Sequence, residues 1–130
     1  MLIASRQSRD YDLPMSHNAS DTNWRSTCPV ACTLDIVGDK WTLLIVRDLF
    51  AGKKTYGDFQ QSPEKIPTNI LADRLKRLRR HGIVTRHPYQ ERPIRYEYLL
   101  TPKGKELGPV LKAMVKWGEK HVPGSKAAIR

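Results

Sequence analysis

The stretch PTNILADRLKRLRRHGIVTRHPYQERPIRYEYLL, residues 67–100, decides the fold of this 130-residue chain. Its first half predicts a helix over 67–81, because apolar side chains recur at about 100° per residue and fall on one face. Pro67 suits the first turn of such a helix, and Gly82 suits the position just after its end. The opposite face is mostly cationic, so the helix is amphipathic with a basic outer face.

The second half of this stretch predicts a β-hairpin. Residues 83–87 and 95–100 alternate polar and apolar side chains, as half-buried strands do. Pro88 cannot donate a ladder hydrogen bond, so we expect it to end the first strand, and the turn at 90–93 gives the hairpin a charged tip. A helix with a polar outer face followed by a two-stranded ribbon is the organisation of a winged helix-turn-helix.

Further helices flank this unit. Before it we expect a short helix over 29–38, an apolar and therefore buried helix over 40–51, and a short helix over 55–61. After it, Thr101 is expected to cap one long final helix over 102–121. The predicted fold class is mainly α with a small β-hairpin, a winged helix-turn-helix.

At the two ends of the chain, apolar residues do not recur with the periodicity of a helix or a strand. Residues 1–24 are polar and predict a disordered N-terminal tail, and residues 123–130 predict a frayed C-terminal tail. No run approaches the roughly 18 apolar residues of a membrane span, and the first thirty residues lack the apolar block of a signal peptide. We therefore expect a cytoplasmic protein with no membrane partner.

The charge balance favours a polyanionic partner. Lys and Arg number 23 against 13 Asp and Glu, a net charge of +10. Residues 52–105 hold 13 of the basic residues and 5 of the acidic ones, so eight of the ten excess charges lie there. The cationic helix gives its apolar face to the core, which disfavours membrane binding and leaves double-stranded DNA as the expected partner.

The expected DNA-binding residues lie on the helix and on the hairpin. Thr68 and Asn69, in the first turn of the helix, would face base edges in the major groove. Basic residues further along would reach the groove and its flanking phosphates; they are Lys76, Arg77, Arg79 and Arg80. The hairpin offers Arg92 and Arg95, of which Arg92 would enter the narrow minor groove. Asp73 is a discordant acid on the same face, which either orients a neighbouring arginine or accepts a hydrogen bond from cytosine.

Two cysteines, Cys28 and Cys32, are too few for a disulfide scaffold and are expected to be thiols. The four histidines are scattered, so we expect neither a metal site nor a cofactor. Cys28 directly precedes Pro29 at a predicted helix N-terminus, where free N–H groups stabilise a thiolate. A reactive thiol and a small buried hydrophobe both remain open.

The final helix carries more apolar surface than one small core needs, because Trp117 lies near its end. A homodimer would use that surplus, with the helix over 29–38 joining the interface. The residues expected in this interface are Val30, Leu34, Leu107, Val110, Leu111, Met114 and Trp117. No Ser/His/Asp constellation, carboxylate pair or dinucleotide fingerprint is present, so we do not expect an enzyme.

Eight short motifs together resemble the HxlR-type transcriptional regulators. The motifs are Cys28-Pro29-Val30, Leu34-Asp35-Ile36-Val37-Gly38-Asp39-Lys40-Trp41, Arg47-Asp48-Leu49, Tyr56-Gly57-Asp58-Phe59, Leu71-Ala72-Asp73-Arg74-Leu75, Gly82-Ile83-Val84, Arg95-Tyr96-Glu97-Tyr98-Leu99-Leu100-Thr101 and Trp117-Gly118. The resemblance implies a MarR-like winged helix over 25–122, a homodimer built from its first and last helices, and bacterial DNA-binding regulation. Some members sense electrophiles, oxidants or aldehydes through the cysteine matching Cys28, whereas Cys32 matches no family position.

We therefore expect a dimeric transcriptional regulator, a repressor, that binds an inverted-repeat operator and responds to an oxidant or electrophile through Cys28. Two alternatives remain open. In the first, a small-molecule effector binds between the dimer helices and controls DNA release. In the second, the winged helix binds nucleic acid without sequence preference.

Overall fold

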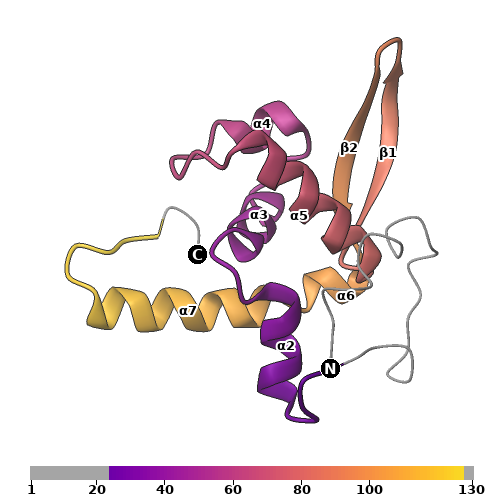
Figure 1. Ribbon diagram of the computed structural model, residues 1–130. Helices are drawn as coiled ribbons and strands as arrows, with labels where there is room; N and C mark the ends of the chain where they lie inside the picture. The colour runs from indigo at the N-terminus through magenta and orange to yellow at the C-terminus, as the bar shows by residue number, and fades with distance from the viewer. Residues whose placement is uncertain (1–23, 128–130) are drawn as a thin grey trace.

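The computed structural model describes residues 24–127, which form six helices and one antiparallel hairpin (Figure 1). The elements are α2 Pro29–Val37, α3 Thr42–Phe50, α4 Tyr56–Gln60, α5 Thr68–Arg80, β1 Val84–Glu91, β2 Ile94–Leu100, α6 Pro102–Lys105 and α7 Gly108–His121. The predicted class, mainly helical with a two-stranded hairpin, is confirmed. The predicted tails at 1–23 and 128–130 lie outside the described residues.

The core lies where α3, α4, α5 and the base of the hairpin meet. Its buried residues are Ile45, Val46, Leu49, Phe59, Leu71, Leu75, Leu78, Ile83, Val84 and Tyr98. Three turns of α5 contribute to it, as the apolar face predicted for that helix requires. The ring of Phe59 meets the ring of Tyr98 edge-on at 6.4 Å between centroids, which joins α4 to the hairpin. Helices α4 and α5 and the base of the hairpin therefore share one core.

Local caps set the helix starts. The hydroxyl of Thr55 accepts from the N–H of Asp58, whose carboxylate accepts from the N–H of Thr55, so a capping box opens α4. Asp39 accepts hydrogen bonds from the N–H groups of Trp41 and Thr42 at 3.0 and 3.2 Å, and so caps α3. Gly82, with φ of 73°, follows α5 in a conformation that costs other residues free energy.

The expectation that Pro88 ends the first strand is wrong. Pro88 lies opposite Tyr96, and the ladder resumes after a shift of register with Gln90 opposite Arg95. Strands tolerate proline at an irregularity of the ladder, because no partner needs its missing N–H there. The hairpin is consequently longer than predicted and stands out from the core (Figure 1).

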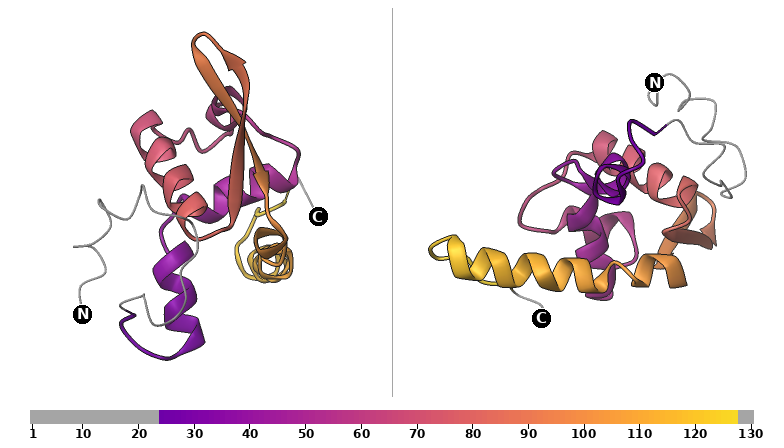
Figure 2. Two further views of the ribbon diagram at one scale, coloured as in Figure 1. Left: turned by 90° about the vertical axis from the view of Figure 1, so that its right-hand side faces the viewer. Right: turned by 90° about the horizontal axis from the view of Figure 1, so that it is seen from below.

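The expectation of one continuous final helix is also wrong. The chain forms a short α6, turns at 106–107, and begins α7 at Gly108. Pro109 has no N–H to donate to a carbonyl one turn earlier, so the ladder breaks there and proline becomes an early residue of a new helix. This break lets α7 leave the hairpin base and pack along α3 (Figure 2).

The C-terminal segment that the structure describes makes one contact with α7. The N–H of Ala127 donates to the carboxylate of Glu119 at 3.0 Å, which ties the end of the described chain to α7. None of the helices within 24–127 is long and apolar enough to cross a bilayer.

Candidate nucleic-acid interface

One face of α5 is open to solvent. Leu71, Leu75 and Leu78 point into the core, and the other side of the helix presents an exposed stripe of Thr68, Asn69, Ala72 and Lys76. The hydroxyl of Thr68 accepts a hydrogen bond from the amide of Gln60 at 3.1 Å. The structure thus brings three predicted residues together on the stripe. Ala72 was not predicted as part of this stripe, although it lies four residues from both Thr68 and Lys76, a spacing that places all three on one face of a helix.

Arg77 does not lie on this stripe. Its Nη2 donates to the backbone carbonyl of Asp35 at 3.4 Å, so its guanidinium lies between α5 and α2. Its Nε is buried without a hydrogen-bond partner within the described chain. The expected placement of Arg77 toward DNA is wrong, because this flank of the helix is covered by α2, which a helical wheel cannot foresee.

The prediction that Arg80 lies on the exposed face of α5 is also wrong. Its side chain is only 4% exposed, although the wheel assigns it to the outer face. An angle around the helix axis says nothing about which segments enclose the last turn of the helix. A guanidinium enclosed to this degree does not present itself to a phosphate.

An ion pair fixes α5 to the start of α3. The Nε of Arg74 lies 2.9 Å from Oδ2 of Asp39, the residue that caps α3. Partial burial opposes ionisation of Asp39, but hydrogen bonds from Thr42, Arg74 and Trp41 outweigh it and lower its pKa to about 2. Asp73 approaches Nη1 of Arg74 at 2.5 Å, so it orients a neighbouring arginine, the first of its two expected roles. Asp39 and Arg74 lie 35 residues apart in the chain, so no local pattern in the sequence pairs them.

The long link between α4 and α5 is pinned to α3. The hydroxyl of Ser62 donates to Asp48, a carboxylate that is only 6% exposed, and Lys53 donates to Ser62 at 2.8 Å. The guanidinium of Arg47 makes two hydrogen bonds of 2.8 Å to Glu64 and lowers the pKa of that carboxyl. These contacts hold the first turn of α5 in a set position despite the length of the link.

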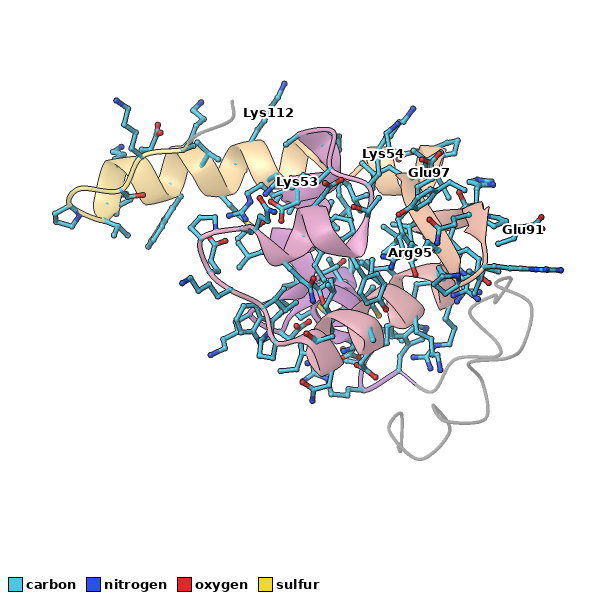
Figure 3. All side chains as sticks on the ribbon, turned by 90° about the horizontal axis from the view of Figure 1, so that it is seen from above. Lys53, Lys54, Glu91, Arg95, Glu97 and Lys112 are labelled. Atoms are coloured by element: carbon cyan, nitrogen blue, oxygen red, sulfur yellow. The ribbon has the colours of Figure 1, made fainter. Side chains whose placement is uncertain are left out.

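The hairpin presents its two predicted arginines to solvent. Arg92 and Arg95 are exposed, and the amide of Gln90 donates to the carbonyl of Pro93 at 2.9 Å, which stabilises the turn. Figure 3 shows Arg95 and Glu91 on the hairpin, away from α7. The stripe on α5 and the arginines of the hairpin together form the candidate interface.

Cys28 is the exposed N-cap of α2, so the interpretation as a buried hydrophobe does not hold for it. The backbone N–H groups of Ala31 and Val30, at the start of α2, lower the pKa of its thiol. Cys32, half-buried, donates to the carbonyl of Ser26 at 3.3 Å. Within residues 24–127 no group of three or more metal-ligating side chains gathers.

An apolar surface remains uncovered on α2 and α7, at the end of the molecule opposite the hairpin tip (Figures 1 and 2). Met114 is 53% and Trp117 64% exposed. The residues of this apolar surface are Val30, Leu34, Val110, Met114 and Trp117. Leu107 and Leu111, expected in the same interface, instead pack against the core of their own protomer, because they lie on the side of α7 that faces α3.

Comparison with known proteins gives consistent matches. Residues 36–126 match the family described as HxlR-like helix-turn-helix. The HTH-type transcriptional regulator YdeP of Bacillus subtilis is 40% identical over 94 residues, which cover 72% of this chain and 73% of that protein.

Solved structures agree with this match. The fold is similar to that of PA1607, with a TM-score of 0.69 and 43% identity over 79% of this chain and 72% of that one. It is also similar to the redox regulator HypR in its oxidised form, with a TM-score of 0.66 and 36% identity over 72% and 97% of the two chains. The reduced form of the transcriptional regulator YodB from B. subtilis has a TM-score of 0.62 and 29% identity over 78% and 100%.

Proposed function

The chain belongs to the HxlR-like helix-turn-helix family of transcriptional regulators, and from this premise we propose that it binds an inverted-repeat operator in duplex DNA as a homodimer. The observation that carries the proposal is the exposed stripe of α5 beside the arginines of the hairpin. An α-helix fits the major groove, and a basic hairpin tip suits the narrow minor groove next to it. The proposed mode is repression in the cytoplasm.

The apolar surface supports the dimer. Trp117 and Met114 are large apolar side chains that remain more than half exposed in the protomer. Exposed apolar patches of this kind mark interaction sites, and a second copy of the chain would cover both patches in a twofold arrangement. A twofold protein then reads a twofold operator, with half-sites about one helical turn of DNA apart or a multiple of it.

Selection from a random pool of duplexes with the purified protein tests this proposal. The selected sequences are expected to contain two inverted half-sites with a constant spacing. Equal affinity for selected and unselected duplexes would instead support the winged helix that binds nucleic acid without sequence preference.

Replacing Asn69 with alanine is expected to lower affinity for the selected operator about tenfold and to leave affinity for a mixed-sequence duplex unchanged. The carboxamide of asparagine can make two hydrogen bonds to adenine, a contact that discriminates among bases by about 1–3 kcal/mol. Fluorescence anisotropy on the two duplexes measures this difference. Lys76→Ala is the matched control, because loss of a phosphate contact weakens both duplexes alike. Equal losses for Asn69→Ala on both duplexes would exclude a role in reading bases.

We also propose that Cys28 is the sensing thiol of this regulator. The thiol is exposed, and the amides of Val30 and Ala31 lower its pKa, which raises the fraction of reactive thiolate near neutral pH. An adduct on the sulfur would place a bulky group at the start of α2 and disturb this end of the helix. Because Arg77 of α5 is hydrogen-bonded to Asp35 of α2, a change in α2 reaches the recognition helix.

Treatment with N-ethylmaleimide is expected to release the wild-type protein from its operator, whereas Cys28→Ser stays bound. The thiolate adds to the alkene carbon, an S–C bond forms, and the neighbouring carbon takes a proton from water. Anisotropy before and after treatment measures release, and mass spectrometry counts adducts. Cys32→Ser is the matched control and is expected to respond as the wild type does. If Cys28→Ser still releases DNA, the thiol is not the sensor, and a small-molecule effector becomes the better explanation.

A further inference from the structure

Within the described chain, two buried side-chain atoms have no hydrogen-bond partner, and they belong to residues that already contact each other. The atoms are Oδ2 of Asp35 on α2 and Nε of Arg77 on α5. The Nη2 of Arg77 donates to the backbone carbonyl of Asp35 at 3.4 Å, so this arginine reaches the residue that carries the other atom. One atom is an acceptor and the other a donor, so each is a suitable partner for the other.

The carboxylate of Asp35 has a different partner in this structure. Its Oδ1 lies 2.6 Å from Nε of Arg25, in the segment that precedes α2 and runs beside that helix (Figure 1). The side chain of Asp35 is 10% exposed, whereas that of Arg25 is 53% exposed. A carboxylate enclosed to this degree needs a counter-ion. An exposed arginine, by contrast, exchanges such a contact for water at little cost in free energy.

Arg77 offers the better geometry for the same carboxylate. Nε and Nη2 form one edge of a guanidinium, and such an edge binds the two oxygens of a carboxylate through parallel hydrogen bonds. In this structure the edge makes one long contact to a carbonyl and leaves one buried N–H unused. Pairing with the carboxylate of Asp35 would satisfy both unpartnered atoms, and a buried polar atom without a partner is costly. Two arginines therefore compete for one carboxylate.

The segment that carries Arg25 is tied to both cysteines. The N–H of Cys28 donates to the hydroxyl of Ser26 at 2.9 Å, and the thiol of Cys32 donates to the carbonyl of Ser26 at 3.3 Å. Ser26 directly follows Arg25 in the chain. A bulky group on the thiol of Cys28 would disturb these contacts and move Arg25 away from Asp35.

We propose that Arg25 and Arg77 are alternative partners of the Asp35 carboxylate, and that the exchange between them carries a change at Cys28 to α5. When Arg25 leaves, the carboxylate turns to Nε and Nη2 of Arg77 and alters how α5 is held against α2. Asp35 is thus a positioning residue for α5. The trigger rests on the proposed sensing thiol, whereas the exchange itself does not.

Removal of Arg25 tests the exchange without DNA. Arg25→Ala is expected to leave Tm unchanged or to raise it, because Arg77 then pairs with Asp35 and no buried atom of the two residues stays unpartnered. Arg47→Ala is the contrast, since it takes an arginine from the buried carboxylate of Asp48 with no unpartnered arginine N–H beside it. Its Tm is expected to fall by about 5 °C or more. Calorimetry measures both, and an equal fall for Arg25→Ala would overturn the exchange.

Arg77→Gln completes a double-mutant cycle, because glutamine keeps an N–H for the carbonyl of Asp35 but lacks the guanidinium edge. The fall in Tm that it causes is expected to be at least about 5 °C larger in the Arg25→Ala background than in the wild type. In an Asp35→Asn background, the fall is expected to be the same with and without Arg25. Equal falls in the wild-type and Arg25→Ala backgrounds would contradict competition for one carboxylate.

NMR of the arginine side chains follows the trigger. The Nε–H proton signal of Arg77, assigned by its loss in Arg77→Lys, is expected to move downfield in Arg25→Ala, because hydrogen bonds to a carboxylate are short and strong. N-ethylmaleimide is expected to move the signal in the same direction in the wild type but not in Cys28→Ser.

The operator separates the two proposals. If the treated wild type releases the operator while the Arg77 signal stays fixed, the role of Asp35 is wrong and the sensing thiol stands. If the signal moves and the operator stays bound, the exchange is supported and the sensing thiol is wrong.

Discussion

Replacing Trp117 with lysine is expected to convert the dimer to a monomer and to lower operator affinity by about 10²–10⁴-fold. Tryptophan is the residue type that most often dominates an interface, and this one is 64% exposed in the protomer. A lysine there would place an ammonium in an apolar contact at a large desolvation cost. When separate monomers bind the two half-sites, the affinity that a dimer gains by linking the two binding events is lost.

Sedimentation velocity at micromolar concentration measures the first effect, and anisotropy on the selected operator measures the second. The substitution is expected to leave the protomer folded, because the one ring contact recorded for Trp117 within the described chain is with His121, one turn away at 4.9 Å. Lys112→Gln on the same helix is the matched control and is expected to remain dimeric. A wild type that sediments as a monomer of 14.9 kDa would contradict the dimer itself.

Replacing Gly104 with alanine is expected to destabilise the protein by about 1–3 kcal/mol or more and to lower Tm by about 5–20 °C. Gly104 is buried in α6, and a Cβ there would lie 2.2 Å from the carbonyl oxygen of Ile83. That oxygen belongs to the backbone and accepts hydrogen bonds from Thr101, so it cannot move away without disturbing the base of the hairpin. Differential scanning calorimetry measures the change.

Gly57→Ala provides the matched control, because Gly57 also lies in a short helix but has space. A Cβ at Gly57 would meet only the hydroxyl of Thr55 at 3.9 Å. Alanine has a better helix propensity than glycine by up to about 1 kcal/mol, so Tm is expected to stay the same or rise. Equal falls in Tm for the two variants would show that the close approach of α6 to Ile83 is not what requires a glycine.

Much of the fold was predictable because its signals are local. Pro67, Gly82 and the leucines of α5 set that helix within one continuous stretch, and Thr55 caps α4 through Asp58 only three residues away. The alternation in 95–100 likewise predicted β2. The two wrong predictions of element boundaries both fall at prolines, because a proline is compatible with more than one local structure. Pro88 can end a strand or lie at an irregularity of the ladder, and Pro109 can sit within a stripe of apolar residues yet start a new helix.

The candidate site was predictable only in part, for a related reason. Thr68, Asn69 and Lys76 are exposed as predicted, because a side chain opposite the apolar stripe of a helix lies in solvent unless something covers it. The sequence alone does not say what covers a given position. That is why Arg77, which contacts α2, and Arg80, which is enclosed, were placed wrongly.

The sequence by itself determined the order of the elements as far as the hairpin, and the basic character of the segment that carries α5 and the hairpin, because these depend on neighbours a few residues away. Only the tertiary structure decided which distant groups meet. It pairs Asp39 with Arg74, turns Leu107 and Leu111 toward the core, and leaves Trp117 uncovered. Burial and charge pairing depend on the packing of whole elements, and no periodicity along the chain encodes which face of one helix another will cover.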